Sequence, residues 1–399
     1  MSIVRGTGLP VFLAYAVFVL VGMSAAVAGV LLPAQMADYG VDKPTIGITF
    51  FTFSAGFMLA GSTAGPLVHR FGTRLVLIAG GGAYVLAALY TGVRPPFVAF
   101  LAVQVLAGYG TGLLESVLNV FLARLPSATT LLNRLHAFFG VGALLGPLLA
   151  VWMLRFMPWQ AVWVVLALVC VPLVAGFVLA YPRRDDDGVT HERTPVTPAR
   201  SGLLATVLRS PAVLLACAFL AVYVGLEIGV GNWGFSYLVG EHALPELTAG
   251  YTVSGYWLGL TAGRFLISPI ATRIGSTTTG MTYACLVGVA AAIGLAWLAP
   301  VAAVAAVGFV LLGFFLGPLF PTAMAVVPYL TEPRLVPTAI GVMNGLSVAG
   351  SAGLPWLAGA VAQGAGVWTL MPFVMVLALL QLLIWWLLVA RMSTRQVRV

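Results

Sequence analysis

Apolar stretches of about 20 residues recur along the whole chain, and each is long enough to cross the hydrocarbon core of a membrane as a helix. Of the 399 residues, 61% are hydrophobic and only 8% are charged, which would make the surface of a water-soluble protein too apolar. We therefore predict an all-α polytopic membrane protein embedded in a lipid bilayer. Its twelve predicted transmembrane helices are residues 9–34, 44–69, 74–93, 97–124, 130–154, 159–181, 211–239, 247–273, 277–298, 301–330, 335–362 and 367–391.

Positive charges are distributed unevenly between the two sides that twelve crossings define. The side with both termini carries fifteen arginines, whereas the opposite loops carry only Lys43, Arg94 and Arg155. Cytoplasmic loops of membrane proteins hold the excess of Lys and Arg. We therefore expect a multi-pass protein of the cell membrane, in the first place a bacterial inner membrane, with both termini cytoplasmic. The net charge of +8 then reflects topology and gives no reason to expect a nucleic-acid partner.

A single long polar segment divides the twelve stretches into six and six. We predict an N-terminal six-helix bundle over residues 1–182, a cytoplasmic linker over 183–210 and a C-terminal six-helix bundle over 211–399. Motifs of the first half recur in the second, which indicates two pseudo-symmetric halves, as in many transporters. The matched pairs are Pro66/Pro269, Arg70/Arg273 and Gly72/Gly275 at an offset of 203, Gly108/Gly313 and Gly112/Gly317 at 205, and His136/Asn344 at 208.

Residues 65–74, Gly-Pro-Leu-Val-His-Arg-Phe-Gly-Thr-Arg, resemble the signature cytoplasmic loop of the major facilitator superfamily (MFS). Further segments resemble the fucose:proton symporter branch of that superfamily and related sugar carriers. This resemblance implies the MFS fold and secondary active transport by alternating access. The segments are residues 115–119, 135–147, 223–233, 256–265, 317–321 and 354–356.

The resemblance assigns a conformational role to the loop motif and exposes two departures from the family pattern. One is His69, which stands where the loop usually has an acidic residue. The other is the first helix, which lacks the acid of fucose carriers and has only Asp38 at its outer end. The predicted loop motif is Gly65, His69, Arg70, Gly72 and Arg74.

Glu115 and Glu227 are the two acidic residues of eleven that lie within apolar stretches. A charged carboxylate at the centre of a lipid-exposed helix costs about 3 kcal/mol. Glu115 shares one helix face with Gly112 and Asn119, and the resemblance matches Glu115 and Asn119 to the acid and amide that handle proton and sugar. We predict that Glu115 exchanges a coupling proton; the alternative is a permanently neutral or ion-paired structural residue.

His136 is predicted at a depth similar to that of Glu115. It could relay the proton of that carboxyl group, or it could be a helix-end histidine bonded to the backbone. Glu227 could be a second proton site, a substrate contact or the structural partner of Arg264. Counting about 1.5 Å per residue places Glu227 and Arg264 at depths that differ by roughly 10 Å. Pairing would therefore need helix tilt or extended side chains.

Inner aromatic rings could stack on the apolar face of a sugar while amides and charged groups bind its hydroxyls, although most membrane tryptophans only pack or sit at the interface. Four other tryptophans, Trp152, Trp159, Trp385 and Trp386, are expected in the interfacial belts. The predicted substrate-binding residues are Asn119, Asn232, Trp233, Tyr256, Trp257, Arg264, Asn344 and Trp356.

The leading function is therefore proton-coupled symport of a monosaccharide or similar small polar solute. The alternative is proton-driven efflux of an amphipathic compound or drug, which a partial fifth-helix motif, Gly142-x-x-x-Gly146-Pro147, also suggests. A membrane receptor that binds without transporting is a third possibility. We expect no enzyme activity, metal or cofactor beyond the coupling proton, because the sequence shows no nucleophile–base set, metal-ligand cluster or phosphate loop. A monomer is expected.

Overall fold

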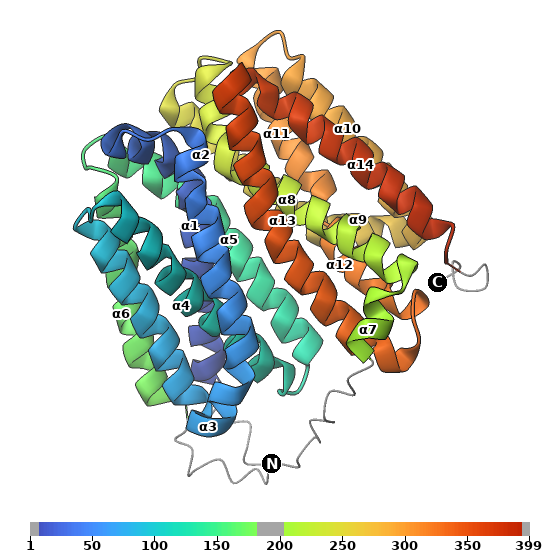
Figure 1. Cartoon of the computed structure of the whole chain (residues 1–399), viewed down its shortest axis with the longest axis horizontal. Helices are drawn as coiled ribbons and strands as arrows, with labels where there is room; N and C mark the ends of the chain where they lie inside the picture. Colours follow the sequence, from blue (N-terminus) through green and yellow to red (C-terminus); the bar gives the residue numbers. More distant parts are fainter. Residues whose placement is uncertain (1–7, 182–202, 393–399) are drawn as a thin grey trace. The chain divides into compact units, whose positions relative to one another are not determined.

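The computed structural model describes residues 8–181 and 203–392, and every regular element in them is helical (Figure 1). The contacts divide the chain into two compact units, Met1–His191 and Glu192–Val399. Most of the predicted linker, residues 183–202, lies outside the described residues; its last part forms the short helix α7 (Leu203–Leu208).

The N-terminal unit contains one continuous helical segment that accounts for two predicted spans. This helix, α3, turns sharply at Gly72, whose φ of 81° and ψ of 159° are open essentially to glycine alone. The turn lies where the second predicted span gives way to the third. The helices of the unit are α1 (Gly8–Tyr39), α2 (Lys43–Ile46), α3 (Ile48–Gly92), α4 (Phe97–Ala123), α5 (Ala128–Leu154) and α6 (Gln160–Ala180).

The C-terminal unit repeats this order with shorter pieces. Ser210 accepts a hydrogen bond from the Val213 backbone N–H and Pro211 occupies the first turn, which starts α8. Residues 317–318, Gly-Pro, separate α11 from α12. The helices are α8 (Pro211–Gly240), α9 (Glu246–Arg273), α10 (Thr278–Trp297), α11 (Ala302–Leu316), α12 (Leu319–Ala325), α13 (Val336–Ala365) and α14 (Leu370–Val389), with 3-10 turns at Val327–Tyr329, Pro333–Leu335 and Val367–Thr369.

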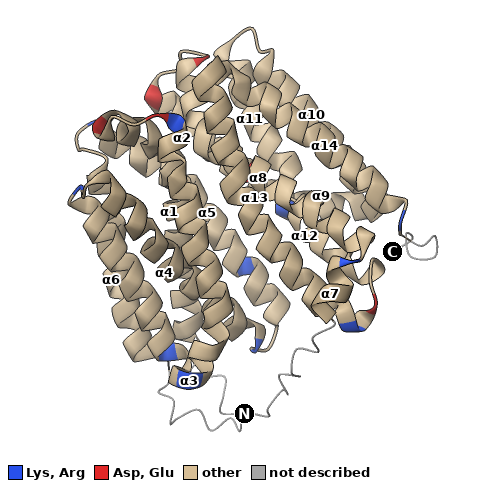
Figure 2. Cartoon of the chain, viewed as in Figure 1, with Lys and Arg blue, Asp and Glu red and all other residues tan. Residues whose placement is uncertain are grey.

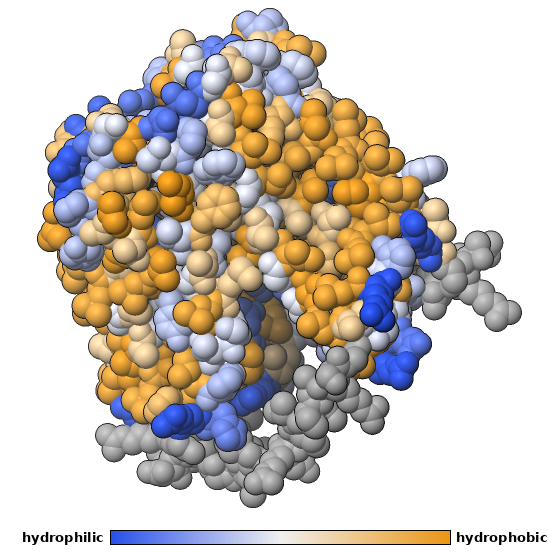
Figure 3. Space-filling view, viewed as in Figure 1, coloured by the Kyte–Doolittle hydropathy of each residue, from blue (hydrophilic) through white to orange (hydrophobic). Residues whose placement is uncertain are grey.

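Ten helical segments of the described residues are long and apolar enough to cross a membrane. One of them, Lys43–Gly92, contains the turn at Gly72 and therefore holds two spans. The more polar α9 falls outside this set, although its 28 residues are long enough to cross. These observations agree with the predicted twelve-helix fold. In each unit the helix sides are largely hydrophobic and the charged residues gather near the helix ends (Figures 2 and 3).

The same helix pairs form in both units. In the N-terminal unit α1 packs along α5, and α3 packs along α4 and α6; in the C-terminal unit α8 packs along α13, α9 along α11, and α10 along α14 (Figure 1). This shared pairing is a structural form of the internal repeat that the sequence motifs predict.

Glycines sit where the paired helices come closest. A methyl group added to Gly22 of α1 would overlap the carbonyl of Phe139 in α5, and one added to Gly142 of α5 would overlap the carbonyl of Val19 in α1. At the α8–α13 crossing, a methyl group on Gly350 would overlap the carbonyl of Ala221 in α8, and one on Gly225 would overlap the Leu354 side chain and the Gly350 carbonyl of α13. The offsets, 225 − 22 = 203 and 350 − 142 = 208, equal those of the sequence motifs. The repeat therefore extends to the helix crossings themselves.

At the predicted outer end of the N-terminal unit, Asp38 ties three segments together. Its Oδ2 accepts hydrogen bonds from Arg94 Nε at 2.6 Å, Trp159 Nε1 at 3.0 Å and Gln160 Nε2 at 3.2 Å. These donors belong to the α3–α4 connection and the start of α6. Trp159 is only 3% exposed, so its ring packs inside the unit at the helix end where an interfacial belt is predicted. The indole binds the end of α1 through Asp38.

Replacing Asp38 by Asn should lower the apparent melting temperature by a few degrees. The ion pair with Arg94 is partly exposed and contributes about 0–1 kcal/mol, while each hydrogen bond to the carboxylate adds about 1 kcal/mol. Thermal unfolding of the detergent-purified protein measures the change. Asp42→Asn is the control, because Asp42 is a nearby acid whose capping bond to the Thr45 N–H an Asn can also accept. Equal melting temperatures for both variants would contradict this role of Asp38.

Candidate functional site

Glu115 lies within α4, seven residues after Gly108 and three after Gly112, which press against the backbone of α3 at Phe53 and Phe57. The Glu115 side chain is half-buried, and none of the residues in the described ranges forms a hydrogen bond or ion pair with its carboxylate. The Asn119 amide donates to the Glu115 backbone carbonyl at 2.9 Å, one turn away in the same helix. The N-terminal unit thus holds an acid without a fixed counter-charge.

His136 lies early in α5 and is exposed, with its ring edge-on to Phe18 of α1 at a centroid distance of 5.8 Å. Because the Glu115 carboxylate has no hydrogen-bonded partner among the described residues, the predicted relay between His136 and Glu115 is not formed in this structure. A direct transfer between them would need a side-chain movement or a bridging water.

The loop motif surrounds the turn of α3. Gly72 supplies the turn itself, and its repeat counterpart Gly275 also has a positive φ, of 70°. Arg70 is exposed and its guanidinium lies 5.2 Å from the centroid of the Phe71 ring. Gly65 and His69 are exposed as well, and Arg74 is half-buried.

The structure pairs the acid and the arginine of the C-terminal unit. Arg264 Nη2 of α9 lies 3.7 Å from Glu227 Oε1 of α8, and Arg264 Nε donates to the Gly317 carbonyl at 3.3 Å. The side chains of Arg264 and Glu227 are 25% and 12% exposed. The depth difference of roughly 10 Å expected from residue counting is overcome, because each partner has a long side chain and the two helices pack against each other.

Two tyrosines complete this cluster. The Tyr256 hydroxyl of α9 donates to the Glu227 backbone carbonyl at 2.9 Å, which fixes α9 against α8. The Tyr223 hydroxyl, one turn before Glu227, is buried and has no hydrogen-bond partner among the described residues, although it lies beside both Glu227 and Arg264. Two phenol groups therefore lie beside the pair, while part of the Arg264 side chain stays exposed.

The predicted aromatic substrate contacts are mostly packing residues in this structure. Trp233 is 3% exposed and its indole donates to the Pro355 carbonyl at 2.8 Å, while Trp257 is 3% exposed and lies against Gly231. Asn232 is also buried, and Trp356 is half-buried.

Asn344, by contrast, is exposed on α13. Of the predicted substrate-binding residues, therefore, Asn119, Arg264, Asn344 and Trp356 keep some exposed surface, whereas the buried rings have none to offer a solute without rearrangement. Of the tryptophans predicted for the interfacial belts, Trp152 and Trp386 are 56% and 59% exposed, whereas Trp385 is fully buried within its unit.

The repeat reveals site residues that the sequence reasoning missed. At the offset of 205, Glu115 corresponds to Phe320, whose ring lies 6.1 Å from that of Tyr223. At the offset of 203, Glu227 corresponds to Ser24, whose hydroxyl is hydrogen-bonded to that of Tyr84. Each acid thus stands where the other unit has an uncharged residue. Extending the motif offsets along the helices would have found these pairs.

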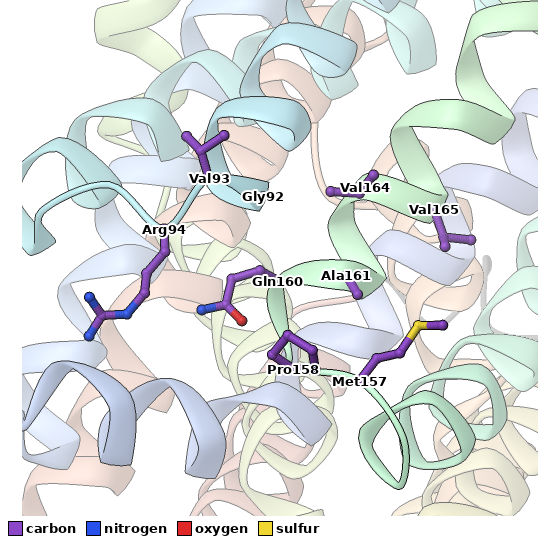
Figure 4. A pocket seen from close by; sticks show the side chains of 9 residues that line it. All are labelled: Gly92, Val93, Arg94, Met157, Pro158, Gln160, Ala161, Val164 and Val165. Atoms are coloured by element: carbon purple, nitrogen blue, oxygen red, sulfur yellow. The ribbon is translucent and has the colours of Figure 1, made fainter.

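One hollow within the N-terminal unit is lined by none of the predicted site residues. It measures about 500 Å³ and lies where the ends of α3 and α5 meet the start of α6, between Val93, Met157, Pro158 and Val164 (Figure 4). Arg94 and Gln160 extend to one side of it, where both bind Asp38. No group of His, Cys, Asp and Glu in the described part of the chain could hold a metal ion, and the three cysteines are buried and free.

The model of the Major Facilitator Superfamily matches residues 14–309 and 231–398, two overlapping matches that reach from the first helix to the last. The chain belongs to the major facilitator superfamily. It is therefore a multi-pass membrane protein with the fold of a family of small-molecule transporters.

Three MFS comparisons describe how the chain relates to known proteins. It is 24% identical over 388 residues to Bypass of stop codon protein 6 of Saccharomyces cerevisiae, covering 88% of this chain and 76% of the yeast protein. It is 26% identical over 367 residues to the multidrug resistance protein MdtL of Escherichia coli, covering 85% of each. The crystal structure of the E. coli fucose:proton symporter FucP matches with a TM-score of 0.61 at 18% identity, over 96% of this chain and 99% of that one. At this identity, the FucP likeness concerns the fold alone.

Proposed function

We propose that this MFS protein is a secondary active transporter that carries a small polar solute, in the first place a monosaccharide, into the cell together with a proton. The observation that carries this proposal is the lone carboxylate of Glu115, half-buried in a membrane-spanning helix without a counter-charge among the described residues. Membrane helices place such groups on ion and substrate pathways. The fold of FucP, which is named as a fucose:proton symporter, is compatible with the same coupling.

Coupling follows from the cost of moving a charge through a medium of low dielectric constant. An ionised Glu115 opposes the step in which the carrier reorients, and protonation removes that opposition. An inward proton releases about 2.3 kcal/mol for each 100 mV of membrane potential. That energy concentrates a neutral solute roughly 40-fold. One titrating carboxyl group is therefore sufficient for uphill uptake.

The proposed setting is a bacterial inner membrane, with both termini in the cytoplasm and the protein acting as a monomer. The distribution of arginines supports this orientation, since fifteen lie on the side that carries the termini. In this orientation the turn at Gly72 faces the cytoplasm and Asp38 faces outward.

A second candidate is proton-driven efflux of an amphipathic compound. It is favoured by the likeness to MdtL, a protein named for multidrug resistance, over 85% of both chains. The direction of net flux separates the two candidates, because an inside-alkaline pH gradient drives uptake by a symporter and has the opposite effect on accumulation by an antiporter.

The test is transport by the purified full chain in proteoliposomes. A thermal-shift screen against sugars at one acidic and one alkaline pH first selects a ligand, since a bound ligand raises the melting temperature. An imposed inside-alkaline gradient should then drive accumulation of that sugar, and a protonophore should abolish it. Drug efflux with no sugar accumulation would favour the second candidate, and saturable binding without flux would favour a receptor and contradict both.

A further inference from the structure

Arg264 uses few of its hydrogen-bond donors. Its guanidinium carries five N–H groups in a planar fork. Within the described residues, only the Nε donor has a hydrogen-bonded acceptor, the Gly317 carbonyl at 3.3 Å. The approach of Nη2 to Glu227 Oε1 is 3.7 Å, beyond hydrogen-bonding distance. Glu227 thus neutralises the charge of Arg264, although most of the N–H groups of the guanidinium form no hydrogen bond with the described residues.

A strong arginine–carboxylate pair has more and shorter bonds than the pair of Arg264 and Glu227. Arginine and carboxylate commonly form two parallel bonds of about 2.7–2.9 Å. Here one long contact links the pair, while a quarter of the Arg264 side chain is exposed. A second carboxylate could therefore reach the guanidinium from the exposed side and make the short bonds that Glu227 does not make.

A further polar group lies in the same place. The Tyr223 hydroxyl is buried beside both members of the pair and interacts with them, but none of its contacts with the described residues has the geometry of a full hydrogen bond. Tyr223 itself is 0% exposed, so its hydroxyl becomes available to a solute only when the Glu227 side chain moves away. A buried, unpaired hydroxyl is costly. An additional oxygen acceptor at the guanidinium would relieve that cost.

The geometry points to a carboxylate-binding subsite at Arg264 and Tyr223, in which the carboxylate of an acidic solute such as a sugar acid displaces Glu227. This inference rests on the proposed function and narrows its solute to hydroxylated acids. Glu227 is then the internal competitor that keeps the guanidinium neutral while the site is empty. A purely structural pair would have no such exchange.

The test compares matched neutral and acidic sugars, namely glucose with glucuronate and galactose with galacturonate, by ligand-induced thermal shift of the full chain. We expect an acid to bind more tightly than its neutral partner. Arg264→Gln should lose this preference, whereas Glu227→Gln, which removes the competitor, should tighten acid binding by on the order of tenfold. Equal binding of the acidic and neutral members of both pairs would overturn the inference, as would weaker acid binding in Glu227→Gln.

Control variants keep the test decisive. Arg155→Gln removes one positive charge from an exposed loop arginine that contacts the Phe156 ring, and it should retain the preference for acids. Arg264→Gln leaves a buried acid unpaired and could unfold the protein. The double variant Glu227→Gln/Arg264→Gln avoids this problem because it leaves neither member of the pair with an unpaired charge, and it should bind both members of each sugar pair equally.

The outcomes for the two proposals are separable. Proton-driven accumulation of a neutral sugar with no acid preference leaves the symport proposal standing and contradicts the subsite. Acid binding that depends on Arg264 without any proton-driven flux supports the subsite and contradicts symport.

Discussion

Glu115→Gln should abolish proton-driven accumulation of the solute while leaving exchange of solute across the membrane at or near the wild-type rate. Gln has nearly the shape of a protonated Glu but cannot release a proton. A carrier fixed in this state still reorients when loaded, so labelled solute exchanges with unlabelled solute. It cannot gain energy from the proton gradient, because no group changes its charge between the two sides.

The measurement uses the same proteoliposomes for both modes. Uptake driven by an inside-alkaline gradient should no longer rise above equilibration, while counterflow under equal pH on both sides should persist. Glu246→Gln is the matched control, because Glu246 is an exposed acid at the start of α9 and its loss changes the net charge equally. Uphill uptake that survives in Glu115→Gln would assign the coupling proton elsewhere, with Glu227 the next acid to examine.

Gly350→Ala should lower stability strongly, while Gly345→Ala in the same helix should leave it unchanged or raise it. A methyl group at Gly350 would overlap the Ala221 carbonyl of α8, whereas one at Gly345 meets no atom within 4 Å. Overpacking of this kind typically costs about 1–3 kcal/mol. In an open helix position, Ala is favoured over Gly by up to about 1 kcal/mol. Gly350→Ala should therefore melt clearly below the wild type, and Gly345→Ala at or above it.

Thermal unfolding of the purified variants decides this prediction, and counterflow activity shows whether the folded fraction still works. Van der Waals packing of close backbones is a main source of helix association in membranes, where lipid removes most of the hydrophobic driving force. Equal melting temperatures for Gly350→Ala and Gly345→Ala would mean that the α8–α13 crossing adapts easily to bulk.

The sequence predicts the helices well because their apolar length is dictated by the thickness of the bilayer. It also predicts the break at Gly72, where a short polar motif interrupts two apolar runs and only glycine tolerates the backbone angles. The more polar α9 was predicted as one of the twelve apolar stretches, although it is not apolar enough to fall in the set of ten candidate spans. The length of an apolar stretch can be read within one segment, and the repeat can be read by comparing the two halves of the sequence.

The packing of individual side chains was harder to predict from the sequence. Depth along a helix axis, counted at about 1.5 Å per residue, takes no account of tilt, so it separated Glu227 from Arg264 although the two lie 3.7 Å apart. Position near a helix end made Trp159 and Trp385 look interfacial, yet both are buried. Which face of a helix packs inward depends on the neighbouring helix, and for these residues the neighbours α1 and α8 are distant in the sequence.

The glycine contacts between paired helices have a consequence for how such a carrier can change its cargo. Where a glycine lets two helices meet through backbone atoms, as at Gly22, Gly142 and Gly350, the close approach itself presents few side chains to a solute. The helix packing can then be kept while single polar groups near the crossings are exchanged, as with Glu115 in one half and Phe320 at the matching place in the other. Solute preference in this architecture is then set by a few side chains, and the packing of the helices does not depend on them.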